Sequence, residues 1–190
     1  LGFGRVYVHV DGEFTFEKWM QGLDAGRSFG TTGPLLDCRF NGGHAGRVLR
    51  TDGPMSVAIK GTAESPRPLE RIEILRNGEV VRSVDCVNLP QPGGGFVNRI
   101  DEAVEFESSG WVAVRCFERH PTRRNRFAHT APLHVEIAGR PLMPRRHEVR
   151  YFVLRMEREL ERNRGILEPE ELAEYEQALA EYRRLLEMAR

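Results

Sequence analysis

The sequence lacks the features that mark a strongly charged or membrane-spanning protein. Its 28 basic and 28 acidic side chains cancel over 190 residues, so no overall field attracts nucleic acid or an anionic membrane. No apolar run is long enough to span a bilayer, and no signal peptide is recognisable. The chain opens with Leu1 and not Met, which predicts a fragment or a processed product. Its compartment is therefore unknown, and cytoplasmic only by default.

Cysteine is also scarce. Cys38, Cys86 and Cys116 are three in number, and no two of them have the C-x-x-C spacing. An odd number without that spacing argues against a disulfide scaffold and against a structural zinc site. We expect all three thiols to be buried as small apolar side chains.

The stretch from Leu69 to Asp85 predicts a β-hairpin. Asn77 and Gly78 tolerate the positive φ of a two-residue type I′ loop, and such a loop fixes which residues face each other. The expected pairs are Arg76 with Glu79, Leu75 with Val80, Ile74 with Val81 and Glu73 with Arg82. One face of the hairpin is then apolar and the other charged, which indicates an antiparallel sheet with one solvated side.

Other short apolar or alternating segments recur along the chain. Strands are expected at residues 5–10, 36–41, 55–63, 100–107, 110–118 and 128–138. Residues 110–118 are apolar on both faces, which predicts the most central strand. The number and spacing of these segments predict a mainly β fold, an immunoglobulin-like antiparallel β-sandwich.

Helical patterns occur near the two ends. Thr15 can cap a helix that ends at Gly26. After Pro144, two amphipathic segments separated by Gly165 predict an antiparallel helical hairpin, with Pro169 in the first turn of its second helix. The predicted parts are residues 1–35, a strand and helix, residues 36–142, the sandwich, and residues 143–190, the helical hairpin.

The six histidines are scattered, and those at 129 and 134 fall on opposite faces of one predicted strand. Metal binding needs ligands that converge on one point, so we expect no metal site in this chain. The glycine-rich loop at residues 41–46 is not followed by the helix and Lys-Ser/Thr of a phosphate-binding loop. The basic loop at residues 119–126 has only Phe127 close by for stacking, so a solvated loop is favoured over a nucleic-acid surface.

Motifs in a fixed order carry a resemblance to a known family. Those in residues 4–36 are Tyr7-Val8, Asp11-Gly12, Trp19, Ala25-Gly26-Arg27-Ser28-Phe29 and Gly33-Pro34, and further fragments follow at residues 68–73, 77–78, 109–113 and 127–132. This set resembles the end of the catalytic barrel and the C-terminal region of CehA/McbA-type metallohydrolases of the polymerase and histidinol phosphatase (PHP) family. The departures are Thr32, where the family usually has Asn, and Gly30, where it has a β-branched residue.

The resemblance implies that the chemistry lies outside this chain. PHP enzymes bind divalent metals (Mn, Zn or Fe) through an early His-x-His and a late Asp-x-His motif, and neither occurs here. Residues 1–35 would be the remnant of the barrel, and the chain a non-catalytic accessory region that covers the barrel and shapes its substrate entrance. Arg27, Thr31, Thr32 and His129 are the residues that would contribute to that entrance. For Arg27, capping of the local turn is the alternative to contact with an anionic substrate, and for His129 the alternative is an ordinary strand histidine.

A different class of function is also open. An immunoglobulin-like sandwich can be a freestanding module that binds a protein or a glycan, because the fold alone does not decide function. If the chain is instead the accessory region of a hydrolase, its partner is the upstream barrel of the same polypeptide. Exposed apolar residues in the segment 1–30 would then also favour self-association of the isolated chain.

Overall fold

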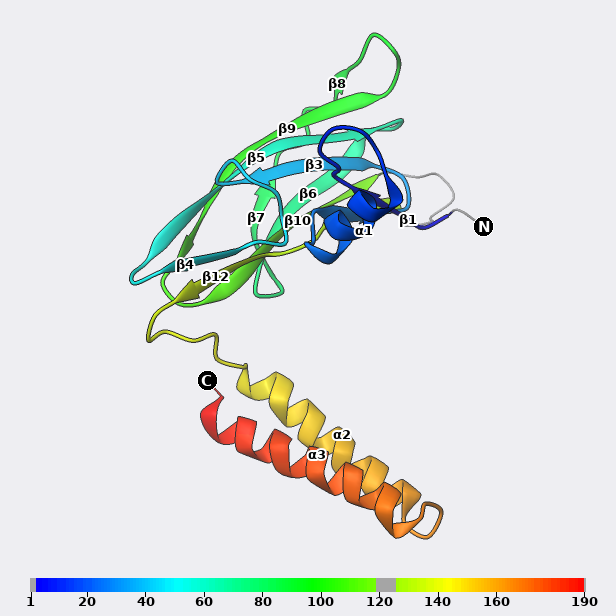
Figure 1. The fold of residues 1–190 in the computed structure, drawn as a ribbon, viewed down its shortest axis with the longest axis vertical. Coiled ribbons are helices and arrows are strands. Elements are labelled where there is room, and N and C mark those ends of the chain that lie inside the picture. Colours follow the sequence, from blue (N-terminus) through cyan, green and yellow to red (C-terminus); the bar gives the residue numbers. More distant parts are fainter. Residues whose placement is uncertain (1–2, 119–125, 190) are drawn as a thin grey trace. The chain divides into compact units, whose positions relative to one another are not determined.

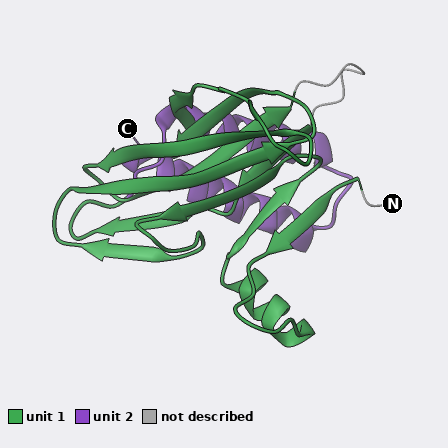
Figure 2. Cartoon of the chain, turned by 90° about the horizontal axis from the view of Figure 1, so that it is seen from above, with its two compact units in different colours: residues 1–141 green, residues 142–190 purple. Residues whose placement is uncertain are grey.

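The computed structural model describes residues 3–118 and 126–189, and these form two compact units. Residues 1–141 make the first unit and residues 142–190 the second, drawn in green and purple in Figure 2. The predicted basic loop lies outside the described residues, except for Arg126.

The first unit is a β-sandwich of two sheets (Figure 1). The larger sheet contains β1 (Arg5–Val8), β2 (Ser28–Thr31), β4 (Val48–Thr51), β6 (Leu69–Arg76), β7 (Glu79–Val84), β10 (Gly110–Glu118), β11 (Arg126–Thr130) and β12 (Leu133–Ile137). The smaller sheet contains β3 (Leu35–Phe40), β5 (Met55–Ser65), β8 (Leu89–Pro90) and β9 (Phe96–Phe106). The described pairs are antiparallel apart from β12 with β4, which is parallel. The predicted fold class is thus confirmed.

The core lies between the two sheets and is built from alternate residues along the strands. Its largest fully buried side chains include Phe40, Ile59 and Phe106 from the smaller sheet, and Ile72, Ile74 and Leu133 from the larger one. Strand β10 pairs with β6 along one edge and with β11 and β12 along the other. It is therefore central in its sheet, as its two apolar faces predict.

The single strand expected at residues 128–138 is wrong, because the chain forms two strands there. β11 and β12 pair with successive parts of the same edge of β10. Pro132 lies between them and has no N–H to give to a sheet ladder. The Ala131 N–H donates to the Ser28 carbonyl instead, and the Thr130 hydroxyl accepts the N–H of Val114.

The predicted hairpin is present, with a changed register. Asn77 and Gly78 have φ of 52° and 88°, as a type I′ turn requires, and Arg76 pairs with Glu79 as expected. Beyond Leu75 the register shifts, so Ile74 pairs with Arg82 and not with Val81. A β-bulge at Val81 lets this side chain and Val84 both pack against the core, which a regular two-residue alternation would not allow.

The N-terminal strand is part of the sandwich sheet. β1 pairs with β2, and β2 pairs with β11. The connection between β1 and β2 contains α1 (Phe16–Asp24), which lies beyond the ends of these strands in Figure 2. Thr15 caps this helix by accepting the Lys18 N–H, and Gly26 follows it with φ of 66°. Residues 27–36 supply β2 and the start of β3, and residues 1–35 lie in the same compact unit as the sandwich.

The second unit is the predicted helical hairpin, formed by α2 (Arg146–Asn163) and α3 (Pro169–Met188). Glu168 and Glu171 form a capping box around Pro169 at the start of α3. The rings of Phe152 and Tyr182 stack across the two helices at 5.3 Å. Within the described residues, no helix has the length and apolar character that crossing a membrane requires.

Candidate functional site

The four residues predicted to contribute to a substrate entrance do not converge. Thr31 is buried, and its hydroxyl donates to the Pro34 carbonyl at 2.5 Å and accepts the Gly33 N–H, so it closes the turn after β2. The Thr32 hydroxyl accepts the N–H of Phe127 at 3.0 Å. His129 lies beside Gly30 in the β2–β11 register, and its Nδ1–H donates to the Thr130 carbonyl.

Arg27 is the one of these four that belongs to a polar cluster. Its backbone N–H donates to the Gly22 carbonyl at the end of α1, which caps that turn. Its Nη1 donates to Asp11 Oδ2 at 2.9 Å, while its buried Nε has no hydrogen-bond partner among the described residues. The guanidinium therefore holds a carboxylate that comes from the other end of the α1 connection.

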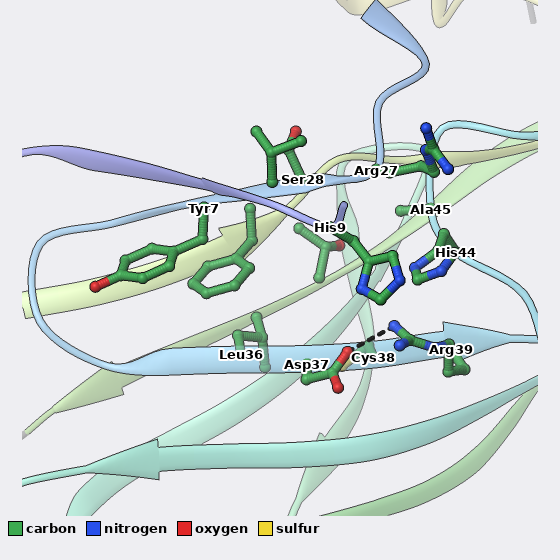
Figure 3. Close-up of a pocket in the computed structure, with 13 residues that line it drawn as sticks. Tyr7, His9, Arg27, Ser28, Leu36, Asp37, Cys38, Arg39, His44 and Ala45 are labelled. Atoms are coloured by element: carbon green, nitrogen blue, oxygen red, sulfur yellow. Dashed lines mark hydrogen bonds and ion pairs between the residues drawn. The ribbon is translucent and has the colours of Figure 1, made fainter. Parts of the chain in front are cut away.

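Two histidines complete this cluster. His9 Nε2 lies 3.0 Å from Asp11 Oδ1, and the His9 and His44 rings are 3.9 Å apart between centroids. One ligand atom from each of His9, Asp11 and His44 lies within 4.8 Å of the other two. We call these three residues the His2Asp cluster. Figure 3 shows His9 and His44 side by side, with Arg27 and Arg39 close to them.

Backbone contacts hold the loop that carries His44. The Arg47 guanidinium donates to the carbonyls of His44 and Phe40, at 3.1 and 2.6 Å. Gly46 lies directly against the end of α1, where a Cβ would stand 1.9 Å from the Ala25 carbonyl oxygen. The loop and the helix end can approach so closely only because Gly46 has no side chain. This approach brings His44 to the end of β1, where His9 follows Val8.

The cluster borders a cavity of about 210 Å³. Tyr7, Phe29 and Leu36 line its apolar part, and Asp37 forms a 2.6 Å ion pair with Arg39 at its polar part. Cys38 also lines the cavity, but burial raises the pKa of its thiol to about 12. A thiol with so high a pKa is a poor nucleophile near neutral pH.

The charges in the cluster follow from its contacts. The hydrogen bond from His9 lowers the pKa of the Asp11 carboxyl, with the charges of His9 and Arg27 acting in the same direction. Burial lowers the pKa of the His44 imidazole, and the nearby Arg39 and His9 lower it further. Asp11 is thus ionised and His44 neutral at neutral pH, so the cluster offers a carboxylate oxygen and an imidazole nitrogen with a free lone pair.

Sequence reasoning missed this cluster because it treated the histidines as scattered. The premise of scattered histidines is wrong for His9 and His44, because the 34 residues between them fold back through α1, β2 and β3. His9 and Asp11 are two positions apart, and this spacing can be seen in the sequence. The position of His44 beside them cannot be predicted from the sequence, because it depends on the contact between a loop and a helix end.

Comparisons of this chain with protein-family models, with curated proteins and with solved structures find no match.

Proposed function

We propose that this chain is the non-catalytic C-terminal accessory region of a PHP-type metal-dependent hydrolase. In this proposal its N-terminal segment packs against the catalytic barrel of the same polypeptide and helps to shape the substrate entrance. The ordered motifs from residue 4 to residue 132 support the family assignment. The observation that carries the proposal is an apolar surface left uncovered on residues 3–20.

This N-terminal apolar surface is defined by six side chains that are more than a third exposed. They are Phe3, Val6, Tyr7, Phe14, Phe16 and Met20, of which Val6 and Tyr7 lie on the two opposite faces of β1. Phe14 and Phe16 are 68% and 66% exposed, and the one buried residue of α1 is Gly22. A helix with an apolar stripe normally buries that stripe against another element. The exposed stripe of α1 is therefore what we expect of a surface that a neighbouring domain covers.

The energetics favour such a cover. Burying one Phe side chain contributes about 1.5–3 kcal/mol, so two exposed phenylalanines account for several kcal/mol of docking free energy. Arg27 and the His2Asp cluster lie at the end of the same strand and helix. A barrel seated on residues 3–20 would thus have this polar cluster at its border, which is where residues of a substrate entrance are expected.

The coding sequence upstream of Leu1 gives the first test. Upstream His-x-His and Asp-x-His motifs in one reading frame with this chain are the expected result. A start codon a few residues before Leu1 would overturn the proposal and leave the freestanding binding module for a protein or glycan.

Hydrogen exchange on the longer polypeptide gives the second test. Amides 5–25 should exchange more slowly in the longer polypeptide than in the isolated chain, because the barrel covers them. Amides 111–117 in the centre of the sandwich serve as the internal control and should exchange equally in both. Equal exchange of amides 5–25 in the two proteins would show that the barrel does not dock there.

A further inference from the structure

We propose that His9, Asp11 and His44 form a binding site for a divalent transition-metal cation such as Zn²⁺. The inference rests on the residues of this chain and is independent of the proposed function. It reverses the expectation from sequence, which assumed that the histidines do not converge.

The geometry is close to that of a three-ligand site. Zn²⁺ binds imidazole nitrogen and carboxylate oxygen at about 2.0–2.2 Å, so two ligands of a tetrahedral ion lie roughly 3.3 Å apart. His9 Nε2 and Asp11 Oδ1 are already 3.0 Å apart. All three ligand atoms fall within 4.8 Å of one another, so an adjustment of about 1.5 Å at His44 closes the set.

The surroundings orient the ligands as outer contacts of metal sites do. Arg27 holds Asp11 through Oδ2, which leaves Oδ1 directed at His9. The backbone N–H of His9 donates to the Arg27 carbonyl at 2.8 Å, which fixes the chain on which the imidazole is carried. A carboxylate that binds a metal is usually held by a further hydrogen bond, as Arg27 holds Asp11. Arg47 holds the backbone of the His44 loop by donating to the His44 carbonyl.

Each of the two arginines near the cluster pairs with a carboxylate, and the partner of Arg27 is the proposed ligand Asp11 itself. Arg27 pairs with Asp11 at 2.9 Å and Arg39 pairs with Asp37 at 2.6 Å. Two imidazoles and one carboxylate are a donor set that suits zinc, copper, nickel or iron, whereas calcium and magnesium prefer oxygen ligands alone. Asp11 is 73% exposed and His9 39%, so an ion can reach the site from solvent and keep one or more water ligands.

The test is a titration of the chain, free of any histidine tag, with Zn²⁺ in a calorimeter. We expect one Zn²⁺ per chain. His44→Gln and Asp11→Asn should each weaken binding at least about tenfold, because each removes one ligand. The control is His134→Gln, which removes an exposed histidine on β12 that is not one of the three proposed ligands, and it should bind as the original chain does.

Circular dichroism of each variant shows whether the fold is kept, and histidine-ring NMR gives a second readout that does not depend on the variants. On addition of Zn²⁺ the ring signals of His9 and His44 should move and those of His134 should stay. The proposal is overturned if no stoichiometric binding occurs, if both cluster variants bind as well as the original, or if ring signals move in proportion to exposure at all histidines.

Discussion

Burial sets the chemistry of the three thiols. Cys38 and Cys116 are buried in the sandwich core, and loss of solvation raises the pKa of each thiol to about 12. Cys86 lies at the edge of the core, half-buried, and burial raises its pKa as well. Because the thiolate is the reactive form, a raised pKa makes all three less reactive than an exposed cysteine. Solvent exposure then distinguishes the half-buried Cys86 from the buried Cys38 and Cys116.

A thiol-specific disulfide reagent at about pH 8 should therefore label one cysteine in the folded chain. With a pKa of about 12, roughly one in ten thousand Cys38 or Cys116 side chains is a thiolate at that pH. Labelling of all three is expected only in denaturant. Cys86→Ser should abolish the labelling of the folded chain, and rapid labelling of that variant would show that the core thiols are accessible.

The hairpin of β6 and β7 shows how local rules and packing combine in one element. The Asn77–Gly78 turn follows from backbone preference, and the pairs next to it are as expected. The bulge at Val81 arises farther from the turn, where the core takes up both Val81 and Val84. Turn chemistry thus fixes the first two pairs, and the packed core fixes the rest.

Replacing Gly78 by Val should destabilise the first unit by about 1–3 kcal/mol, because a β-branched residue resists the φ of 88°. A Cβ at this position meets nothing within 4 Å, so the expected cost is backbone strain and not a clash. Gly78→Asn is the matched control and should retain most of the stability, since Asn tolerates positive φ. Denaturant unfolding measures both, and equal stability of the two variants would contradict the role given to the turn.

At the scale of the whole molecule, the N-terminal apolar surface is the feature that a solution experiment can reach. The surface belongs to β1, α1 and the segment between them, and the other elements of the first unit leave these side chains exposed. In the proposed hydrolase the barrel covers it. In the isolated chain a second copy can do so, because exposed apolar surface favours association.

We therefore expect the sedimentation coefficient of the isolated chain to rise with concentration. Phe16→Ser should weaken this association about ten- to a hundredfold, the equivalent of about 1.5–3 kcal/mol for one buried Phe. Val87→Ser is the control, because Val87 is 69% exposed and lies outside residues 3–20. A monomer at all concentrations, or an equal effect of the two substitutions, would show that the surface does not associate.

Less of the candidate site than of the fold can be predicted from the sequence. Arg27 was expected at a turn near a substrate entrance, and its backbone does close the turn after α1. Its carboxylate partner, Asp11, lies 16 positions away, and His44 reaches the cluster only because Gly46 packs on the end of α1. No spacing rule predicts contacts of this kind.

The sequence by itself determined most of the local elements: the majority of the strands and their central member β10, the hairpin turn, the caps of α1 and α3, and the mainly β class. These follow from short-range backbone preference and from the period of apolar residues, which act within a few positions. The tertiary structure alone decided the bulge at Val81, the break at Pro132, the pairing of β1 with β2, and the meeting of His9 with His44. Each of these depends on which distant segments pack together, because close packing and unmet backbone hydrogen bonds are settled only when the whole sandwich forms.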